Sequence, residues 1–371
     1  MNNTIPMISR SKKNKTHDAS LLSWEEEFEN LPNVFRVNRF SPDIRYVKEI
    51  LESAKDEEDS YLTSLAYYLF TGRDGLWGYG GVESLVLVSW HPNLRGRILI
   101  FPQLGNQQPN LIESLVQEMP PPPAGAQLAR IKPQNAPDAI RFLSDALPVW
   151  KGKASLQPED ILDWLYPAHV IDTRLVAEAK RSCLKGVRNN VNRLASLKPE
   201  VVGLQNIGHP DMLIHLARRW AYMRDPHRIE ELIDPYQKLA TMVFDQSLGL
   251  QGQAVLIDGK VEAFCVWDPP KNSRGMATGL ATLHNPAISG LSDYQYNKMC
   301  ATLARQGVGL LNLGGSETSG LDWFKRKFKP AHSYPLCSID IRYHPLSHIN
   351  LPATVRDADG GRPLLRSRRG N

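Results

Sequence analysis

The chain has 371 residues, of which 42% are hydrophobic and 22% are charged. Those values are typical of a soluble globular protein with enough apolar residues for two cores, and they exclude collagen-like, coiled-coil and wholly disordered chains. No segment approaches the roughly 18–20 consecutive apolar residues of a membrane-spanning helix, and the first twenty residues lack the apolar stretch of a secretory signal. We therefore expect a soluble, cytoplasmic protein with two domains.

The net charge of +5 is concentrated at the two ends of the chain. Residues 1–18 hold four Lys or Arg and one Asp, and residues 356–371 hold five Arg and two Asp. Each end thus carries +3, which leaves −1 for the residues between them. Such ends are either solvated segments that aid solubility or basic arms that hold a polyanion loosely. We expect residues 1–33 and 346–371 to be disordered basic tails.

Neither the cysteines nor the histidines form a metal-binding pattern. The four cysteines lie far apart in the sequence, without a CxxC spacing, and the ten histidines show no HExxH or HxH spacing. We therefore expect reduced cysteines in apolar surroundings and no structural metal.

In the first half of the chain, strands and helices alternate after a helical start. Residues 41–69 are expected to be helical with an acidic break at 56–59, and the glycine-rich segment 72–81 follows them. The expected strands are 84–90, 97–101 and 127–131, and the expected helices are 109–119 and 137–147. Prolines 120–123 end the first of these helices.

A single long helix is expected over residues 173–194. One face is apolar, and another carries a row at helical spacing, Arg181, Lys185, Arg188 and Asn192. Such a row is either solvated surface or a ridge that contacts phosphates.

The second half has the more regular pattern. Amphipathic helices are expected over 211–223 and 235–247, and residues 253–267 form two strands joined at Asp258–Gly259, a strong hairpin signal. The elements expected after the hairpin are a strand over 276–284, a helix over 293–305, a strand over 308–313, a short helix over 321–328 and a strand over 334–342.

This order of elements resembles the GNAT acyltransferase fold, in which two helices, a hairpin, a central strand, a helix, a splayed strand, a helix and a closing strand follow one another. The first half has a similar order, which we interpret as a duplicated unit. The resemblance implies an α+β protein with two tandem GNAT-like domains, each a mixed, mostly antiparallel sheet flanked by helices. The expected domains are 34–172 and a catalytic domain, 201–345, linked by a basic helix within 173–200.

A more specific resemblance rests on GLLNLGGSETSGLDWFKRKFKP (Gly309–Pro330). This segment resembles the C-terminal motif of Fem-like and phosphatidylglycerol lysyltransferase catalytic domains, and Asp163–Leu194 is similar to the segment that joins their two GNAT halves. The resemblance implies a transferase that moves an amino acid from a charged tRNA to an amine or hydroxyl. The multi-helix membrane portion that usually precedes the lysyltransferase domain is missing from this sequence, which favours a soluble acceptor.

Aminoacyl transfer from an ester requires an aligned acceptor, removal of a proton and stabilisation of the oxyanion. Gly314 and Gly315 allow the backbone to approach a donor closely, unless they only form a turn. Asn312 either orients a substrate amide or caps the loop. Glu317 and Asp322 are the nearest carboxylates and the candidate general bases, unless they cap the following helix.

Two lysines of the short helix are candidates for donor contacts. The resemblance implies that Lys325 contacts the donor end and that Lys327 belongs to the donor-binding residues. The alternative is that the charge run from Lys325 to Lys329 is a solvated helix face.

The start of the helix after the central strand separates two classes of donor. In the GNAT fold this helix start, here Asp293 and Tyr296, holds a phosphate through backbone N–H groups. A CoA-dependent GNAT has a glycine-rich loop there, whereas this chain reads HNPAISGLSDYQYNK with one glycine, Gly290. We therefore favour aminoacyl-tRNA over acyl-CoA as the co-substrate and expect no other cofactor. A GNAT pair that only binds a partner is the third alternative.

The expected partners follow from the tRNA hypothesis. Arg181, Lys185, Arg188 and Arg193 are the candidate tRNA-binding residues. The acceptor is expected to be a small molecule, a peptide or a lipid. DNA is not expected as a partner, and peripheral contact with a membrane stays open.

Overall fold

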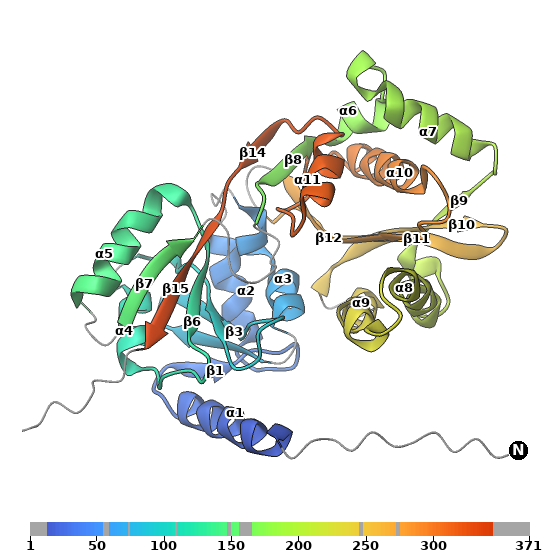
Figure 1. Cartoon of the computed structure of the whole chain (residues 1–371). Coiled ribbons are helices and arrows are strands. Elements are labelled where there is room, and N and C mark those ends of the chain that lie inside the picture. Colours follow the sequence, from blue (N-terminus) through green and yellow to red (C-terminus); the bar gives the residue numbers. More distant parts are fainter. Residues whose placement is uncertain are drawn as a thin grey trace, which may run out of the picture.

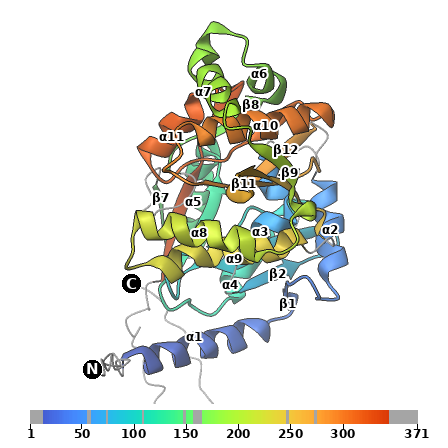
Figure 2. The ribbon, with the colours of Figure 1, turned by 90° about the vertical axis from the view of Figure 1, so that its right-hand side faces the viewer.

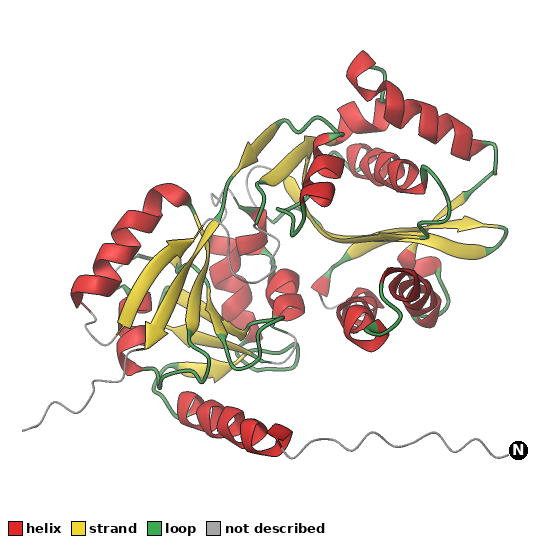
Figure 3. Ribbon diagram, in the orientation of Figure 1, coloured by secondary structure: helices red, strands yellow, loops and turns green. Residues whose placement is uncertain are grey.

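The computed structural model describes residues 13–54, 59–72, 75–107, 110–146, 150–155, 165–244, 248–271 and 275–343. They form two units, each built around one sheet (Figure 1). Figure 3 shows that helices flank the strands of both units. The expected tails at residues 1–12 and 346–371 lie outside the described residues.

The second unit has a seven-stranded sheet in the order β14-β8-β13-β12-β11-β10-β9. Its strands are β8 (Ala168–Asp172), β9 (Glu200–Gly203), β10 (Gln251–Ile257), β11 (Lys260–Asp268), β12 (Met276–His284), β13 (Leu310–Asn312) and β14 (His332–Tyr334). Helices α8 (Asp211–Arg224) and α9 (Ile229–Phe244) lie on one face, and α10 (Leu291–Arg305) and α11 (Ser319–Arg326) lie on the other (Figures 1 and 2).

The first unit has an eight-stranded sheet in the order β1-β2-β3-β4-β6-β15-β7, with β5 paired to β3. Its strands are β1 (Val34–Arg36), β2 (Leu76–Gly80), β3 (Ser84–Trp90), β4 (Ile98–Ile100), β5 (Leu104–Gly105), β6 (Ala126–Ile131), β7 (Trp150–Ser155) and β15 (Cys337–Tyr343). Its helices are α1 (Lys13–Glu29), α2 (Ile44–Ser53), α3 (Leu65–Thr71), α4 (Leu111–Glu118) and α5 (Ala136–Ala146), with a 3-10 turn η1 (Ser60–Thr63) before α3.

The two sheets repeat one topology. In each unit a parallel pair of neighbouring strands is joined through a helix: β4 and β6 through α4, and β12 and β13 through α10. All the other pairs between the described strands are antiparallel. Apart from β5, which has no counterpart among the described strands, the strands follow one another in the same order across the two sheets. This is the order expected for the GNAT fold, so the predicted α+β class with two tandem GNAT-like units is confirmed.

The last strand of each half of the chain lies in the sheet of the other unit, across the boundaries expected at 34–172 and 201–345. Strand β8, from the end of the first half, pairs with β13 and β14 of the second sheet. Strand β15, from the end of the chain, pairs with β6 and β7 of the first sheet. Strand β8 is largely apolar, and β15 alternates apolar residues with Ser338, Asp340 and Arg342. Either pattern suits a strand of either sheet, so the sequences do not specify which sheet receives them.

The disordered tail expected over residues 1–33 is wrong for the part that the structure describes, because Lys13–Glu29 forms helix α1. Trp24 and Phe28, one turn apart, bury their rings against Trp77 and Trp90 of the first sheet. The helix is polar on average, and its few large aromatic side chains supply the buried contacts.

The single helix expected over 173–194 is also corrected. The chain forms α6 (Thr173–Glu178), a 3-10 turn over Ser182–Leu184, and α7 (Lys185–Ala195). The break follows Ala179, which caps α6 in the left-handed conformation at φ +46°. Alanine rarely adopts that conformation, so the sequence carries no signal for the break.

The two units share an apolar interface. Tyr68 and Phe101 of the first unit belong to one buried cluster with Met242 and Leu248, which lie in α9 and shortly after it. In Figure 1, α3 lies next to α9, below β12. The first unit therefore packs on the face of the second sheet that carries α8 and α9, close to where β12 and β13 separate.

Candidate functional site

Strands β12 and β13 separate after three paired positions. Met276, Ala277 and Thr278 pair with Leu310, Leu311 and Asn312, after which β13 ends while β12 continues to His284. The pairing of β11 with β12 also shifts by one residue between Val266 and Trp267, which places a bulge in β12 at the same level. We call the opening beyond Thr278 and Asn312 the splay.

A tyrosine from the first unit lies in the splay. The hydroxyl of Tyr61, in η1, donates a hydrogen bond of 2.5 Å to the carbonyl oxygen of Gly279 in β12. A Cβ on Gly314 would lie 2.7 Å from the same hydroxyl, and Gly314 has a φ of +68°. Gly314 is therefore required for two reasons, a left-handed backbone and close approach, and the group that approaches it is Tyr61.

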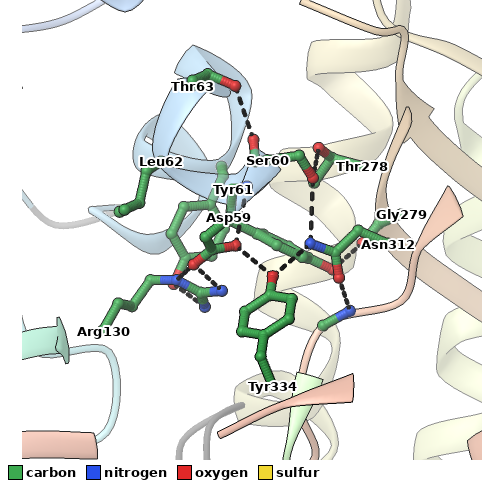
Figure 4. Close-up of polar contacts among 12 residues, drawn as sticks. Asp59, Ser60, Tyr61, Leu62, Thr63, Arg130, Thr278, Gly279, Asn312 and Tyr334 are labelled. Carbon is green, nitrogen blue, oxygen red and sulfur yellow. Dashed lines mark hydrogen bonds and ion pairs between the residues drawn. The ribbon is translucent and has the colours of Figure 1, made fainter. Parts of the chain in front are cut away.

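A buried network holds Tyr61 in place (Figure 4). Asp59 accepts a hydrogen bond from the Tyr61 backbone N–H at 3.2 Å, and its other oxygen pairs with Arg130 at 2.7 Å. The Arg130 guanidinium lies 4.7 Å from the Tyr61 ring centroid. Tyr334 donates to Asp59 at 2.9 Å, and burial together with the Asp59 charge raises the pKa of Tyr334 well above its usual value.

Asn312 joins this network to the loop after β13. Its Nδ2 donates to Tyr334 at 2.7 Å and to Ser60 at 3.2 Å, while its Oδ1 accepts from the backbone N–H of Gly314 at 2.9 Å. Ser60 also accepts a 2.7 Å hydrogen bond from Thr278. Of the two roles expected for Asn312, the observed contacts are those of a loop cap, and they bind the two units together.

Lys325 and Asp322 lie on the buried side of α11, each 6% exposed. The Lys325 ammonium donates to the carbonyl oxygens of Gly314 and Gly315. Asp322 Oδ1 lies 2.8 Å from Nε2 of His169, whose Nδ1 lies 2.7 Å from Ser333 Oγ. Both charged groups thus hold α11 against the sheet and the glycine loop.

Glu317 has a different environment. Its side chain is half-buried, and no hydrogen bond or ion pair joins it to a residue that the structure describes. Burial and, as the second cause, the Glu317 charge raise the pKa of Tyr236 in α9 to about 12. Of the two candidate bases, Glu317 is the one whose carboxylate is available.

Asp293, Lys327 and α7 close the start of α10. The Asp293 side chain, 1% exposed, pairs with Lys327 at 2.7 and 2.5 Å and accepts a hydrogen bond from Asn190. Arg193 donates to the carbonyl and hydroxyl oxygens of Ser289 at 3.1 and 3.0 Å. Two residues expected to bind the donor, Asp293 and Lys327, are thus paired with each other.

Tyr296 lies in an aromatic cluster on the α10 face of the splay. Its ring stacks on Phe328 at 4.8 Å and meets Phe324 at 5.4 Å. Its hydroxyl lies 2.9 Å from that of Thr282, and burial raises its pKa. The splay is therefore filled by aromatic side chains on this face and by Tyr61 on the other.

The four residues expected to bind tRNA have two kinds of environment. Arg181 and Lys185 are exposed, and their side chains bond to no residue that the structure describes. Arg188 donates to the carbonyls of Ala179 and Lys180 at 3.0 Å and so caps α6, while Arg193 bonds Ser289. Because α6 and α7 are separate helices, the expected row is not one straight ridge. Residues 173–198 nevertheless hold seven Lys or Arg and one Glu.

Other features of the described residues bear on the class of site. Within them no three His, Cys, Asp or Glu side chains gather as a metal site, and no helix has the length and apolar character to cross a membrane. Cys265, Cys300 and Cys337 are buried thiols and Cys183 is an exposed one.

Sequence reasoning missed the contribution of the first unit. Asp59, Tyr61 and Arg130 were assigned to a helical segment and an apolar strand, without a role. The available signal was Arg130, a charged residue within the buried strand β6, because a buried guanidinium needs a carboxylate partner.

Comparison with known proteins bears on the fold. No family model matches the sequence, and no curated protein is significantly similar to it. A conserved protein of unknown function from Bacteroides thetaiotaomicron aligns over 84% of this chain and 100% of its own, with a TM-score of 0.61 and 14% identity.

Two further solved structures also align over most of this chain. The C-terminal domain of a putative lysylphosphatidylglycerol synthetase from Agrobacterium fabrum aligns over 80% of this chain and 92% of its own, with a TM-score of 0.52 and 15% identity. FemX aligns over 83% of this chain and 97% of its own, with a TM-score of 0.52 and 10% identity. The resemblance to Fem-like and lysyltransferase-type proteins is thereby confirmed at the level of the tandem GNAT fold.

Proposed function

We propose that this protein is an aminoacyltransferase that moves an amino acid from a charged tRNA to an amine or hydroxyl of a small molecule, peptide or lipid. The proposal is supported by the Gly309–Pro330 motif and by the fold shared with a putative lysylphosphatidylglycerol synthetase and with FemX. Because identities near 10–15% support only the fold, the chemistry has to be argued from the residues of this chain.

One observation carries the preference for a tRNA ester over acyl-CoA: the start of α10 is unsuited to a pyrophosphate. The buried Asp293 carboxylate lies in its first turn, and Arg193 of α7 covers Ser289 directly before it. A diphosphate there would lie against a carboxylate, and α7 would have to move. A donor that needs no phosphate at this helix start agrees better with these contacts.

Glu317 is the proposed general base. The acceptor nitrogen attacks the carbonyl carbon of the aminoacyl ester and gives a proton to the Glu317 carboxylate. The bond between that carbon and the ribose oxygen then breaks, and the ribose hydroxyl leaves with the proton. Lys325 acts as a positioning residue, because its ammonium holds the Gly314 and Gly315 carbonyls and with them the loop that carries Glu317.

The basic segment 173–198 is the proposed contact for the tRNA backbone. Its excess of six positive charges exceeds the net charge of +5 of the whole chain. Arg181 and Lys185, exposed and without partners among the described residues, are the side chains best able to bind phosphates.

One observation favours a second function, a GNAT pair that binds a partner without catalysis. The Tyr61 hydroxyl donates a hydrogen bond to the Gly279 carbonyl, and aromatic rings fill the opposite face of the splay. On the proposed function, Tyr61 moves when the donor binds along β12.

The test is transfer of radiolabelled amino acids from total charged tRNA to an extract of small molecules, peptides and lipids, with ribonuclease-treated tRNA as the control. Glu317→Gln should lower the rate about 10²–10⁴-fold, the usual effect of losing a general base. Glu200→Gln, an exposed glutamate of β9, is the matched control and should transfer at the original rate.

The other outcomes of this experiment favour one of the two alternatives, an acyl-CoA donor or a binding function without catalysis. Transfer that is insensitive to ribonuclease and requires acetyl-CoA would overturn the tRNA donor. No transfer from either donor, together with a stable complex with another protein, would favour the binding function.

A further inference from the structure

A cavity lies between strands β9 and β10 and the helix α10, in the right-hand unit of Figure 1. Its volume is about 890 Å³, which is within the range of small-molecule sites. Most of its α10 wall comes from the second half of the helix, from Lys298 to Gln306, whereas the helix start discussed above is at Leu291. The cavity is therefore separate from the proposed transfer site.

The charges that line this cavity have one sign. Among the described residues that line it are two cations, Lys298 and Arg305, and none is Asp or Glu. Four glutamines add neutral donors and acceptors, and two of them, Gln251 and Gln306, bond to each other at 3.0 Å. A cavity lined by cations and amides without a carboxylate favours an anion.

Two buried donors in the lining have no partner. Gln253 and Trp267 are 3% and 1% exposed, and both line the cavity. Gln253 Oε1 accepts a hydrogen bond of 2.9 Å from Thr302, but Gln253 Nε2 and Trp267 Nε1 have no hydrogen-bond partner among the described residues. An unpaired buried N–H group costs about 1–3 kcal/mol. A ligand oxygen that reaches either nitrogen through a small shift of the lining would therefore be stabilised.

Lys298 and Arg305 are not equally suited to bind an anion in the cavity. Lys298 is half-buried and lies in the middle of α10, with its ammonium 5.0 Å from the Tyr294 ring. Arg305 is exposed, donates to Thr302 at 3.2 Å, and lies in the last turn, where the helix end already carries partial negative charge. Part of the Arg305 charge therefore offsets the helix end, and Lys298 is the stronger anion-binding group.

We propose that this cavity is a binding site for a small organic anion, with acceptor oxygens for Lys298 and the unpaired donors and a flat apolar body against Trp267 and Tyr294. Such a ligand carries a carboxylate, sulfonate or phosphate on a ring system. The site does not use the residues of the proposed transfer chemistry: none of its described lining residues lies on β12, β13 or the loop that carries Glu317, although Trp267 pairs with Gly279.

A pair of matched probes tests the charge requirement in the full chain. Anilinonaphthalene sulfonate has a flat apolar body and one anionic group, and phenylnaphthylamine has the same rings without the charge. Fluorescence titration should give saturable binding of the sulfonate. Lys298→Ala should weaken that binding about tenfold or more, the effect of losing one charge-assisted hydrogen bond, and should leave phenylnaphthylamine binding unchanged. Arg305→Ala should have a smaller effect.

The control variant is Lys260→Ala, at the exposed turn of the β10–β11 hairpin and outside the cavity, which should bind both probes like the original chain. Trp267→Phe should reduce energy transfer from tryptophan to the bound sulfonate, which locates the probe. Equal binding of the sulfonate by Lys298→Ala and the original chain would overturn the proposal, as would weakening by Lys260→Ala to the same extent. Neither result would affect the Glu317 experiment.

Discussion

At the scale of single residues, the contact between the Tyr61 hydroxyl and the Gly279 carbonyl determines whether a donor could bind along β12. On the proposed function, the amino group of the aminoacyl ester donates to the Gly279 carbonyl when the donor lies along β12. Tyr61 and the donor would then compete for the same acceptor. Tyr61 is also held independently of its hydroxyl, because the Arg130 guanidinium packs on its ring and the buried Asp59 carboxylate accepts from its backbone N–H.

Tyr61→Phe separates these two contributions. Losing the hydroxyl removes the hydrogen bond to the half-buried Gly279 carbonyl, so the free energy of unfolding should fall by about 1 kcal/mol. The same change removes the competitor, so the KM for the charged tRNA should fall about 2- to 10-fold, the equivalent of one net hydrogen bond. Chemical denaturation and transfer kinetics measure the two effects.

The matched control is Tyr68→Phe, which removes another buried hydroxyl, bonded at 3.0 Å to the Leu62 carbonyl in the core of the first unit. It should lower stability in the same way and leave KM unchanged. A KM that stays constant or rises in Tyr61→Phe would show that the hydroxyl does not compete with the donor.

At the scale of elements, the break after Ala179 decides what the basic residues of α6 and α7 can do. Arg188 bonds the carbonyls of Ala179 and Lys180 at the break. Arg181, directly before the 3-10 turn, and Lys185, the first residue of α7, are exposed and have no partners among the described residues. The structural role of Arg188 and the tRNA contacts proposed for Arg181 and Lys185 therefore belong to different cations of one short segment.

The double variant Arg181→Glu, Lys185→Glu should weaken tRNA binding and reduce the slope of log K against log salt by about 1.5–2, the effect of two lost phosphate contacts. The melting temperature should stay close to that of the original chain, because exposed substitutions usually cost less than about 0.5 kcal/mol. Filter binding at several salt concentrations and thermal melts provide both measurements.

Two control variants complete this test. Lys260→Glu, Arg218→Glu changes the net charge equally at other exposed positions and should bind tRNA nearly as well as the original chain. Arg188→Glu should instead lower the melting temperature, since it removes the cap of α6. An equal loss of binding in both double variants would mean that only net charge matters, and would contradict a specific surface on α7.

Local patterns were enough to predict most elements but not their long-range partners. The hairpin at Asp258–Gly259 could be predicted because both residues suit the positive φ values, +51° and +73°, that the tight turn requires. Ala179 gave no such signal. Within the site, Gly314, Gly315 and Glu317 could be predicted because they belong to one local motif. Tyr61 and Asp59 could not, because they contact the second unit at residues more than 200 positions away in the sequence.

At the scale of the whole molecule, the exchange of β8 and β15 makes the two units depend on each other. Strand β15 contributes Cys337, Ile339 and Ile341 to the buried core of the first unit. It also brings Asp340, which pairs with Arg97 at 2.5 Å where both side chains are about 10% exposed. The strand lies between β6 and β7, so its loss would leave two strand edges and a cavity in the core.

A chain that ends at Pro335 should therefore lose the first unit, although the deleted residues come from the opposite end of the sequence. Circular dichroism melts should show no cooperative transition for that unit, and limited proteolysis should cut within residues 75–146. A chain that ends at Tyr343 keeps β15 and should melt like the full chain. If the chain ending at Pro335 instead kept a protected first unit, β15 would be an accessory edge, and the two units would fold independently of the exchange.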